Sequence, residues 1–162
     1  MEISKQSNIY RLYHQQFLPI SKRDAWRFFS TPQNLQKITP EELDFRMTSP
    51  DEGKVYLGQI ITYSIRLNKV FKMNWVTEIT GMIHENSFVD EQRFGPYKMW
   101  HHRHTFEEVD GGVLMTDVVH FKIPFSLIAP LAYRLFIKQN LKRIFSYRTE
   151  KLDELISSNQ LV

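Results

Sequence analysis

The chain has 162 residues, about one domain by length, and its apolar and charged fractions are typical of a soluble globular protein. It contains no cysteine, which excludes disulfides, thiol nucleophiles and zinc sites with sulfur ligands, and fits a reducing compartment. The formal net charge is only +3 and the basic residues form no focused run, so we expect no nucleic-acid partner.

The N-terminal segment, residues 1–18, lacks an apolar run of signal-peptide length. No other window approaches the roughly 18 to 20 apolar residues that a membrane span requires. We therefore expect a cytoplasmic protein that folds as one domain over residues 1–162 and has no integral membrane segment. The sequence leaves the oligomeric state open.

The first predicted strand covers Ile9 to Leu18 and stops at Pro19. Two short helices follow it. Ser21 is the expected cap of the first, with Asp24 three residues later as a weak capping box, and Thr31-Pro32 predicts the start of the second, over 33–38.

From Leu43 to Lys122 the pattern indicates six more strands, divided by turn segments at 49–53, 67–69, 84–86, 95–96 and 110–112. Residues from Ser126 to about Ser157 repeat apolar side chains at helical spacing and predict one long helix of about 45 Å. We therefore predict an α+β fold: a curved seven-stranded antiparallel sheet, two short helices after its first strand, and one long C-terminal helix across it. Space for a ligand would remain between sheet and helix.

Three separated stretches carry a family pattern: AWRFFSTPQNLQKITP (25–40), FVDEQRFGPYKMWHHRHTF (88–106) and GGVLMTDVVHFKIP (111–124). With these stretches and this order of elements, the chain resembles the small stand-alone bacterial members of the SRPBCC superfamily, which includes START, Bet v 1-like and polyketide-cyclase-like proteins. The resemblance implies the helix-grip fold and a hydrophobic cavity that accepts a lipid, a quinone or a polyketide-like molecule. It implies no catalytic residue, because proteins with this fold perform many functions.

Three histidines fall in the predicted strand 97–109, where residues two apart share a face. Trp100, His102, His104 and Phe106 therefore point to one side. If Asp110-Gly111 forms a two-residue hairpin turn, His104 lies opposite Asp117 and His102 opposite Val119, whereas a three-residue loop pairs His102 with His120.

Four hypotheses address this cluster. The His-x-His pair could bind a metal with a carboxylate from Asp117, Asp90 or Glu91, but no second pair completes a closed site, so we assign no metal and no cofactor. His102 or His104 could be a general base positioned by Asp117, in a cyclase, aromatase or dehydratase. The polar groups could instead satisfy one another structurally, or orient a ligand without chemistry.

We expect a non-catalytic binding protein, with the enzyme as the alternative and an interaction module with a vestigial cavity as a third hypothesis. In the last helix, the basic residues Arg134, Lys138 and Lys142 predict a solvated face, with transient membrane-surface contact as the alternative. Glu91 and Arg93 are expected to form a surface pair. The residues predicted to line the cavity are Met73, Trp75, Phe88, Trp100, His102, His104, Met115, Asp117, Leu135 and Phe136.

Overall fold

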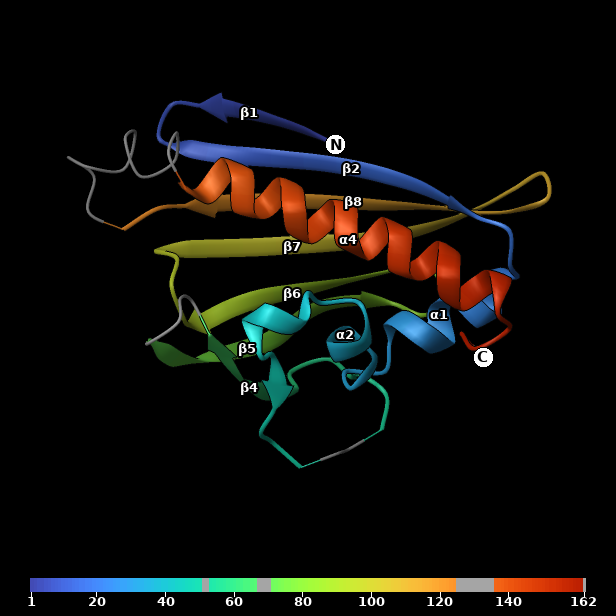
Figure 1. Ribbon diagram of the computed structural model, residues 1–162, viewed down its shortest axis with the longest axis horizontal. Coiled ribbons are helices and arrows are strands. Elements are labelled where there is room, and N and C mark those ends of the chain that lie inside the picture. Colours follow the sequence, from blue (N-terminus) through green and yellow to red (C-terminus); the bar gives the residue numbers. More distant parts are fainter. Residues whose placement is uncertain (51–52, 67–70, 125–135, 162) are drawn as a thin grey trace.

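Eight strands form one antiparallel sheet that curves around a long helix (Figure 1). The computed structural model describes residues 1–50, 53–66, 71–124 and 136–161. Across the sheet the strands are ordered β1-β2-β8-β7-β6-β5-β4-β3, so successive strands are neighbours except where β2 meets β8. The strands are β1 (Glu2–Gln6), β2 (Ile9–Leu18), β3 (Arg46–Met47), β4 (Ile60–Arg66), β5 (Lys72–Ile83), β6 (Ser87–Phe94), β7 (Met99–Val109) and β8 (Gly112–Lys122).

The prediction of seven strands was wrong by one, because β1 precedes the first predicted strand. Gln6 pairs with Ile9 across a two-residue turn, and Ser7 takes a positive φ of 55° there. Four of the five residues of β1 are exposed. A strand that is polar on both sides has no alternating pattern, which is why its sequence gave no strand signal.

The two short helices of the prediction are present, with one changed boundary. Helix α1 (Lys22–Phe29) begins at the expected cap, where the Ser21 hydroxyl accepts a hydrogen bond from the Asp24 backbone N–H. Helix α2 covers only Asn34–Lys37. Thr31 does not cap it, because the Thr31 hydroxyl donates to the carbonyl of Arg27 at the end of α1. A single 3₁₀ turn, η1 (Glu41–Leu43), follows.

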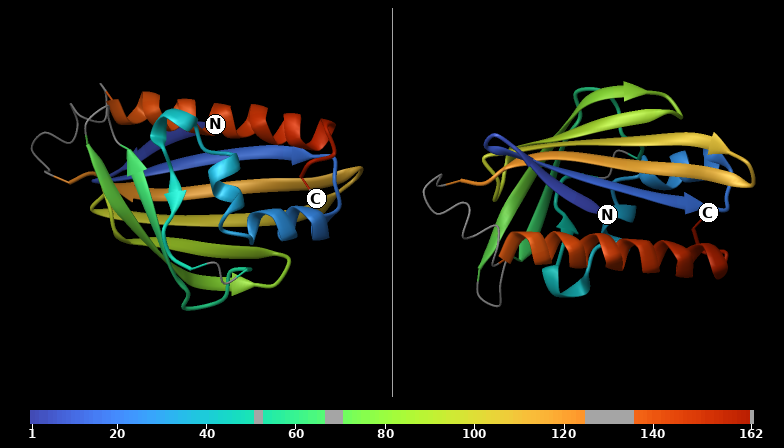
Figure 2. Two further views of the ribbon diagram at one scale, coloured as in Figure 1. Left: turned by 60° about the horizontal axis from the view of Figure 1, so that its bottom comes forward. Right: turned by 90° about the horizontal axis from the view of Figure 1, so that it is seen from above.

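Helix α4 (Lys138–Ser157) forms a layer of its own on one side of the curved sheet (Figure 2). The first part of the predicted long helix, 126–135, lies almost wholly outside the described residues. The Gln16 side chain of β2 ties α4 to the sheet, because it donates hydrogen bonds to the Thr149 carbonyl and to Asp153. Leu141, Phe145, Leu152 and Leu155 are the apolar side chains that α4 buries.

The strand register around the histidines matches the two-residue turn. Val109 pairs with Gly112, so His104 lies opposite Asp117 and His102 opposite Val119, as predicted. On the other side of β7, Asp90 of β6 lies opposite His102. The register of β5 against β6 shifts twice, at Val76/Thr77 and at Ile79/Gly81, and such bulges bend a sheet.

Candidate functional site

A cavity of about 370 Å³ lies between the sheet and α4. This volume falls within the usual range of small-molecule sites. Most of its wall is apolar and aromatic, with a few polar groups on β6, β7 and α4. Among the described residues, the wall consists of Phe28, Phe29, Pro32, Asn34, Leu35, Ile38, Thr39, Leu43, Phe45, Val55, Ile61, Tyr63, Ile65, Trp75, Thr77, Ile79, Phe88, Asp90, Pro96, Tyr97, Trp100, His102, His104, Ile137, Asn140, Leu141, Ile144, Phe145 and Arg148.

Half of the predicted lining set lies in this wall. Trp75, Phe88 and Trp100 contribute aromatic surface, and His102 and His104 contribute the polar part. All five stand on neighbouring strands, β5 to β7, and point to the concave side that faces α4.

The other predicted lining residues lie elsewhere. Met115 and Asp117 are 2% exposed, but they lie behind the wall, Met115 in the packed core and Asp117 below the two histidines. Met73 is half-buried on β5 and outside the described wall. Phe136 is 64% exposed, because the side chains that face the cavity begin at Ile137. Leu135 lies outside the described residues.

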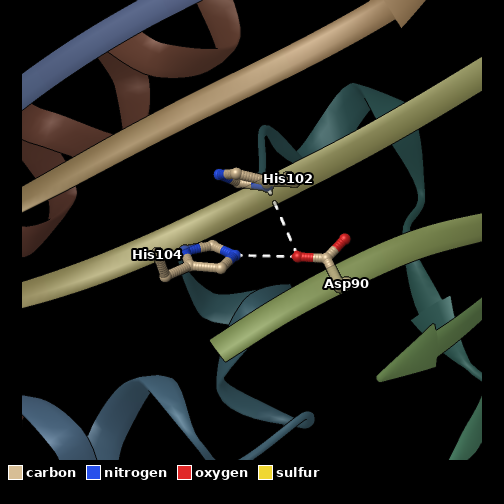
Figure 3. A group of neighbouring side chains, drawn as sticks. All are labelled: Asp90, His102 and His104. Carbon is tan, nitrogen blue, oxygen red and sulfur yellow. Dashed lines mark hydrogen bonds and ion pairs between the residues drawn. The ribbon is translucent and has the colours of Figure 1, made fainter. Parts of the chain in front are cut away.

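The polar part of the wall centres on two histidines and two carboxylates. The Asp90 Oδ2 atom lies 2.8 Å from His104 Nε2 and 3.5 Å from His102 Nδ1 (Figure 3). Behind the rings, Asp117 Oδ1 lies 2.7 Å from His102 Nε2 in a hydrogen bond and 3.0 Å from His104 Nδ1. The His104 Nδ1 contact is not aligned as a hydrogen bond, so it is a charge contact only.

Asp117 receives a second set of neighbours from β2 and α4. His14 Nδ1 lies 3.7 Å from Asp117 Oδ2, and Arg148 Nη1 lies 4.0 Å from Asp117 Oδ1. The ring of His14 is held by Thr149 of α4 at 3.2 Å. The carboxylate of Asp117 therefore connects β2, β7, β8 and α4 at one buried point.

Burial and contacts with neighbouring side chains shift the pKa values of the two carboxylates in opposite directions. Burial alone would raise the pKa of Asp117, but the hydrogen bond to His102 and the close contacts with His104 and His14 outweigh it and hold the pKa well below its usual range. Burial would likewise raise the pKa of Asp90, yet its contacts with His102 and His104 lower it. Both carboxylates are thus ionised at neutral pH.

The two histidines are shifted in opposite directions. Burial and the neighbouring His104 lower the pKa of His102, so this ring is neutral. Burial would also lower the pKa of His104, but its contacts with Asp117 and Asp90 outweigh burial and raise it. A pair of this kind presents one neutral and one readily protonated ring to the cavity.

Arg148 is a charged wall residue that the sequence reasoning missed. It is 7% exposed, its guanidinium lies 5.0 Å above the Phe145 ring, and its buried Nε has no hydrogen-bond partner. A signal for it was present, because Arg148 lies between Ile144 and Leu152 at helical spacing, on the apolar stripe of α4. A charged residue on such a stripe is rarely buried without a reason.

The other charged features lie away from the cavity. Arg93 Nη1 lies 3.4 Å from Glu91 Oε2 on the outer face, in the expected surface pair. Lys138 and Lys142 are exposed on α4, and Arg134 lies outside the described residues. Within the described part of the chain, no helix is both long and apolar enough to cross a membrane.

Comparison with known proteins identifies the fold. No protein-family model and no curated protein matches the sequence. Among solved structures, protein Ms6760 of Mycobacterium smegmatis has a TM-score of 0.68 at 16% identity, over 98% of both chains. The chain has the helix-grip fold that these solved structures share. The predicted resemblance is thereby confirmed at the level of the fold.

Two plant proteins share this helix-grip fold. The major latex-like protein 151 of Panax ginseng has a TM-score of 0.64 at 15% identity, over 91% of this chain and 97% of its own. The norcoclaurine synthase of Thalictrum flavum, solved as a point mutant with a transition-state analogue, has a TM-score of 0.67 at 10% identity, over 99% of both chains. At these identities the likeness shows the fold only, so any inference about function has to come from the site.

Proposed function

We propose that the chain, folded as one cytoplasmic domain over residues 1–162, binds an amphipathic small molecule between its sheet and α4. The observation that carries the proposal is the cavity of about 370 Å³, whose wall is mostly aromatic and aliphatic and includes a cluster of charged and ionisable side chains. Burial of apolar surface, at roughly 25 cal/mol per Å², would supply most of the binding free energy. The same fold holds a transition-state analogue in the norcoclaurine synthase, which is consistent with a small-molecule site.

The polar end of the ligand would contact Arg148. Its Nε is a buried donor without a partner, and its guanidinium carbon lies over the Phe145 ring. A buried donor left unsatisfied costs about 1–3 kcal/mol, and an acceptor on the ligand would remove this cost. Because the donor is charged, we expect a carboxylate, sulfonate or phosphate to bind better than a neutral acceptor.

Two measurements test whether the cavity binds small molecules. Native mass spectrometry of the protein, followed by extraction, should identify a co-purified amphipathic molecule. Calorimetric titration with 8-anilinonaphthalene-1-sulfonate should give one site per chain. Ile144→Trp, which places a larger ring at the wall, should weaken this probe at least about tenfold, since it occupies the space that the probe needs.

Tyr147→Trp is the matched control, because Tyr147 lies on the same helix but outside the wall. It should leave the affinity of the probe unchanged. Equal effects of the two substitutions, or a wild-type protein that binds neither the probe nor any co-purified molecule, would overturn the proposal.

Arg148→Met tests the polar contact, because it keeps an unbranched side chain that can cover the apolar wall and removes the guanidinium. The anionic probe should bind about 10- to 100-fold more weakly, as expected for a hydrogen bond to a charged group. The neutral analogue N-phenyl-1-naphthylamine should keep its affinity, and Arg148→Lys should restore part of the loss for the anionic probe. Equal losses for both probes would show that Arg148 only supports the wall.

A further inference from the structure

Three side chains of the cavity wall converge on one point. Asp90 of β6 lies opposite His102 of β7, and His104 follows two residues later on the same face. One carboxylate oxygen, Asp90 Oδ2, lies 2.8 Å from His104 Nε2 and 3.5 Å from His102 Nδ1 (Figure 3). Among the described residues, these form the one group of three histidine or carboxylate side chains close enough to share a metal ion.

The fourth group of the cluster, Asp117, contacts the other nitrogen of each ring. Asp117 Oδ1 lies 2.7 Å from His102 Nε2 and 3.0 Å from His104 Nδ1. If each ring carries its proton on the nitrogen nearer Asp117, both lone pairs face Asp90 Oδ2. If His104 carries a second proton, on Nε2, this N–H donates a hydrogen bond to Asp90. The lone pair of His102 Nδ1 still faces the carboxylate. A cation placed between the three acceptors removes this repulsion.

The spacing suits a transition metal. Metal–nitrogen and metal–oxygen bonds of about 2.0–2.2 Å place adjacent ligand atoms about 2.8–3.1 Å apart in octahedral sites and about 3.3–3.6 Å apart in tetrahedral sites. The two spacings of 2.8 and 3.5 Å fall within these ranges, so small movements complete the geometry. A carboxylate behind a metal-bound imidazole is the usual second partner of a histidine ligand, and Asp117 supplies it through a hydrogen bond to His102 and a charge contact with His104.

We propose that Asp90, His102 and His104 bind a divalent transition-metal ion of the Zn²⁺, Co²⁺ and Fe²⁺ class, with Asp117 positioning both imidazoles. All three ligands line the cavity while Asp117 lies behind them, so the remaining coordination positions face the cavity. Three protein ligands with an open side are typical of metal sites that bind a further molecule, in contrast to closed structural sites. The site does not depend on the small molecule proposed above.

Titration of the chelator-treated protein with Co²⁺ alone tests the site. We expect one equivalent to bind with a dissociation constant of about 10 μM or tighter, with visible d–d absorption. Zn²⁺ should compete for the same equivalent. Asp90→Asn and His104→Gln should each weaken binding at least about 100-fold, and Asp117→Asn should weaken it about 10- to 100-fold.

His101→Gln is the matched control, because His101 stands on the opposite face of β7 beside Glu91. It should leave Co²⁺ binding unchanged. In the wild-type protein, imidazole NMR signals of His102 and His104 should shift on Zn²⁺ addition while those of His101 and His120 stay in place. This measurement uses the wild-type protein, so it does not depend on whether a variant folds.

Absence of binding below about 100 μM would overturn the metal site. So would binding that survives Asp90→Asn and His104→Gln, or that is lost in His101→Gln, since the ion would then be adventitious. Titration of the metal-free protein with the anionic probe tests the small-molecule site separately, so failure of one proposal is distinguishable from failure of the other.

Discussion

A single carboxylate, that of Asp44, collects three basic side chains at the narrow edge of the sheet. Its oxygens lie 2.7 Å from Arg46 Nε, 2.9 Å from Arg66 Nη2 and 2.5 Å from Lys72 Nζ. The hydrogen bonds from Lys72 and Arg46 lower the pKa of Asp44 to about 2. The residue also takes a left-handed backbone conformation, with φ 41°, which asparagine and aspartate tolerate better than most residues.

Asp44→Asn therefore removes the charge and keeps the backbone preference. The folded pKa of about 2 lies below the usual 3.8, so the carboxylate stabilises the fold above pH 3.8 and loses this effect as the pH falls through about 2. We expect the urea midpoint of the variant to be lower than that of the wild type at pH 7, and the difference to shrink toward zero near pH 2. Glu154→Gln, which leaves the exposed partner Lys151, should change the midpoint little.

At this scale, sequence reasoning predicted part of the polar cluster and missed the rest. His102, His104 and Asp117 were predicted to lie together, because strand periodicity and one hairpin turn define their relative positions. Asp90 entered only as one of three carboxylates, since the pairing of β6 with β7 could not be derived from the turn segment between them. Arg148 was missed because the helical pattern was traced through apolar side chains, and a charged residue does not extend such a pattern.

At the scale of elements, the hairpin of β7 and β8 carries the site, and two glycines shape it. Gly111 has a φ of 79°, which a two-residue turn requires. Gly112 instead allows close packing, because a Cβ at this position would overlap the carbonyl oxygen of Leu18 on β2. The close approach of β2 to β8 therefore requires a residue without a side chain at position 112.

Gly112→Ala should lower the free energy of unfolding by about 1–3 kcal/mol, the usual cost of forcing an atom into a packed site. Denaturant unfolding measures this change. Gly111→Asn is the control: its Cβ would meet only a ring atom of Phe17 at 3.9 Å, and asparagine tolerates positive φ. An equal loss in both variants would place the effect in the turn and not in the approach of β2.

The elements themselves were predictable in proportion to their amphipathic character. Strands β4, β7 and β8 alternate buried positions with less buried ones, and the segments between the strands from β4 to β8 carry glycine, proline or asparagine, so their order followed from the sequence. The polar strand β1 lacked this alternation. Helix α2 stopped after four residues because its expected cap was already bonded to α1, a tertiary contact that no local pattern encodes.

At the scale of the whole molecule, packed side chains fill the space between the sheet and α4 at one end, and the cavity occupies the other end. Leu152 and Leu155 pack with Trp26 and Phe106 in a core cluster near α1. Ile144, two helical turns earlier, lines the cavity. One helix thus seals the core with one half and forms the wall of the cavity with the other.

Leu152→Ala and Ile144→Ala compare these two halves directly. Leu152 is fully buried, so its truncation should cost about 2–5 kcal/mol of unfolding free energy, measured by denaturant titration. Ile144 already faces open space. Its truncation should therefore cost less than about 2 kcal/mol of unfolding free energy, because fewer contacts are lost. Equal costs would mean that the cavity closes in solution.

The placement of the three tryptophans gives the molecule an internal optical reporter. Trp75 and Trp100 line the cavity with their rings 5.4 Å apart, while Trp26 lies in the solid end against Phe106. A molecule that enters the cavity changes the surroundings of two indoles and leaves the third unchanged. Intrinsic emission therefore distinguishes filling of the cavity from a change of the whole fold, without any attached dye.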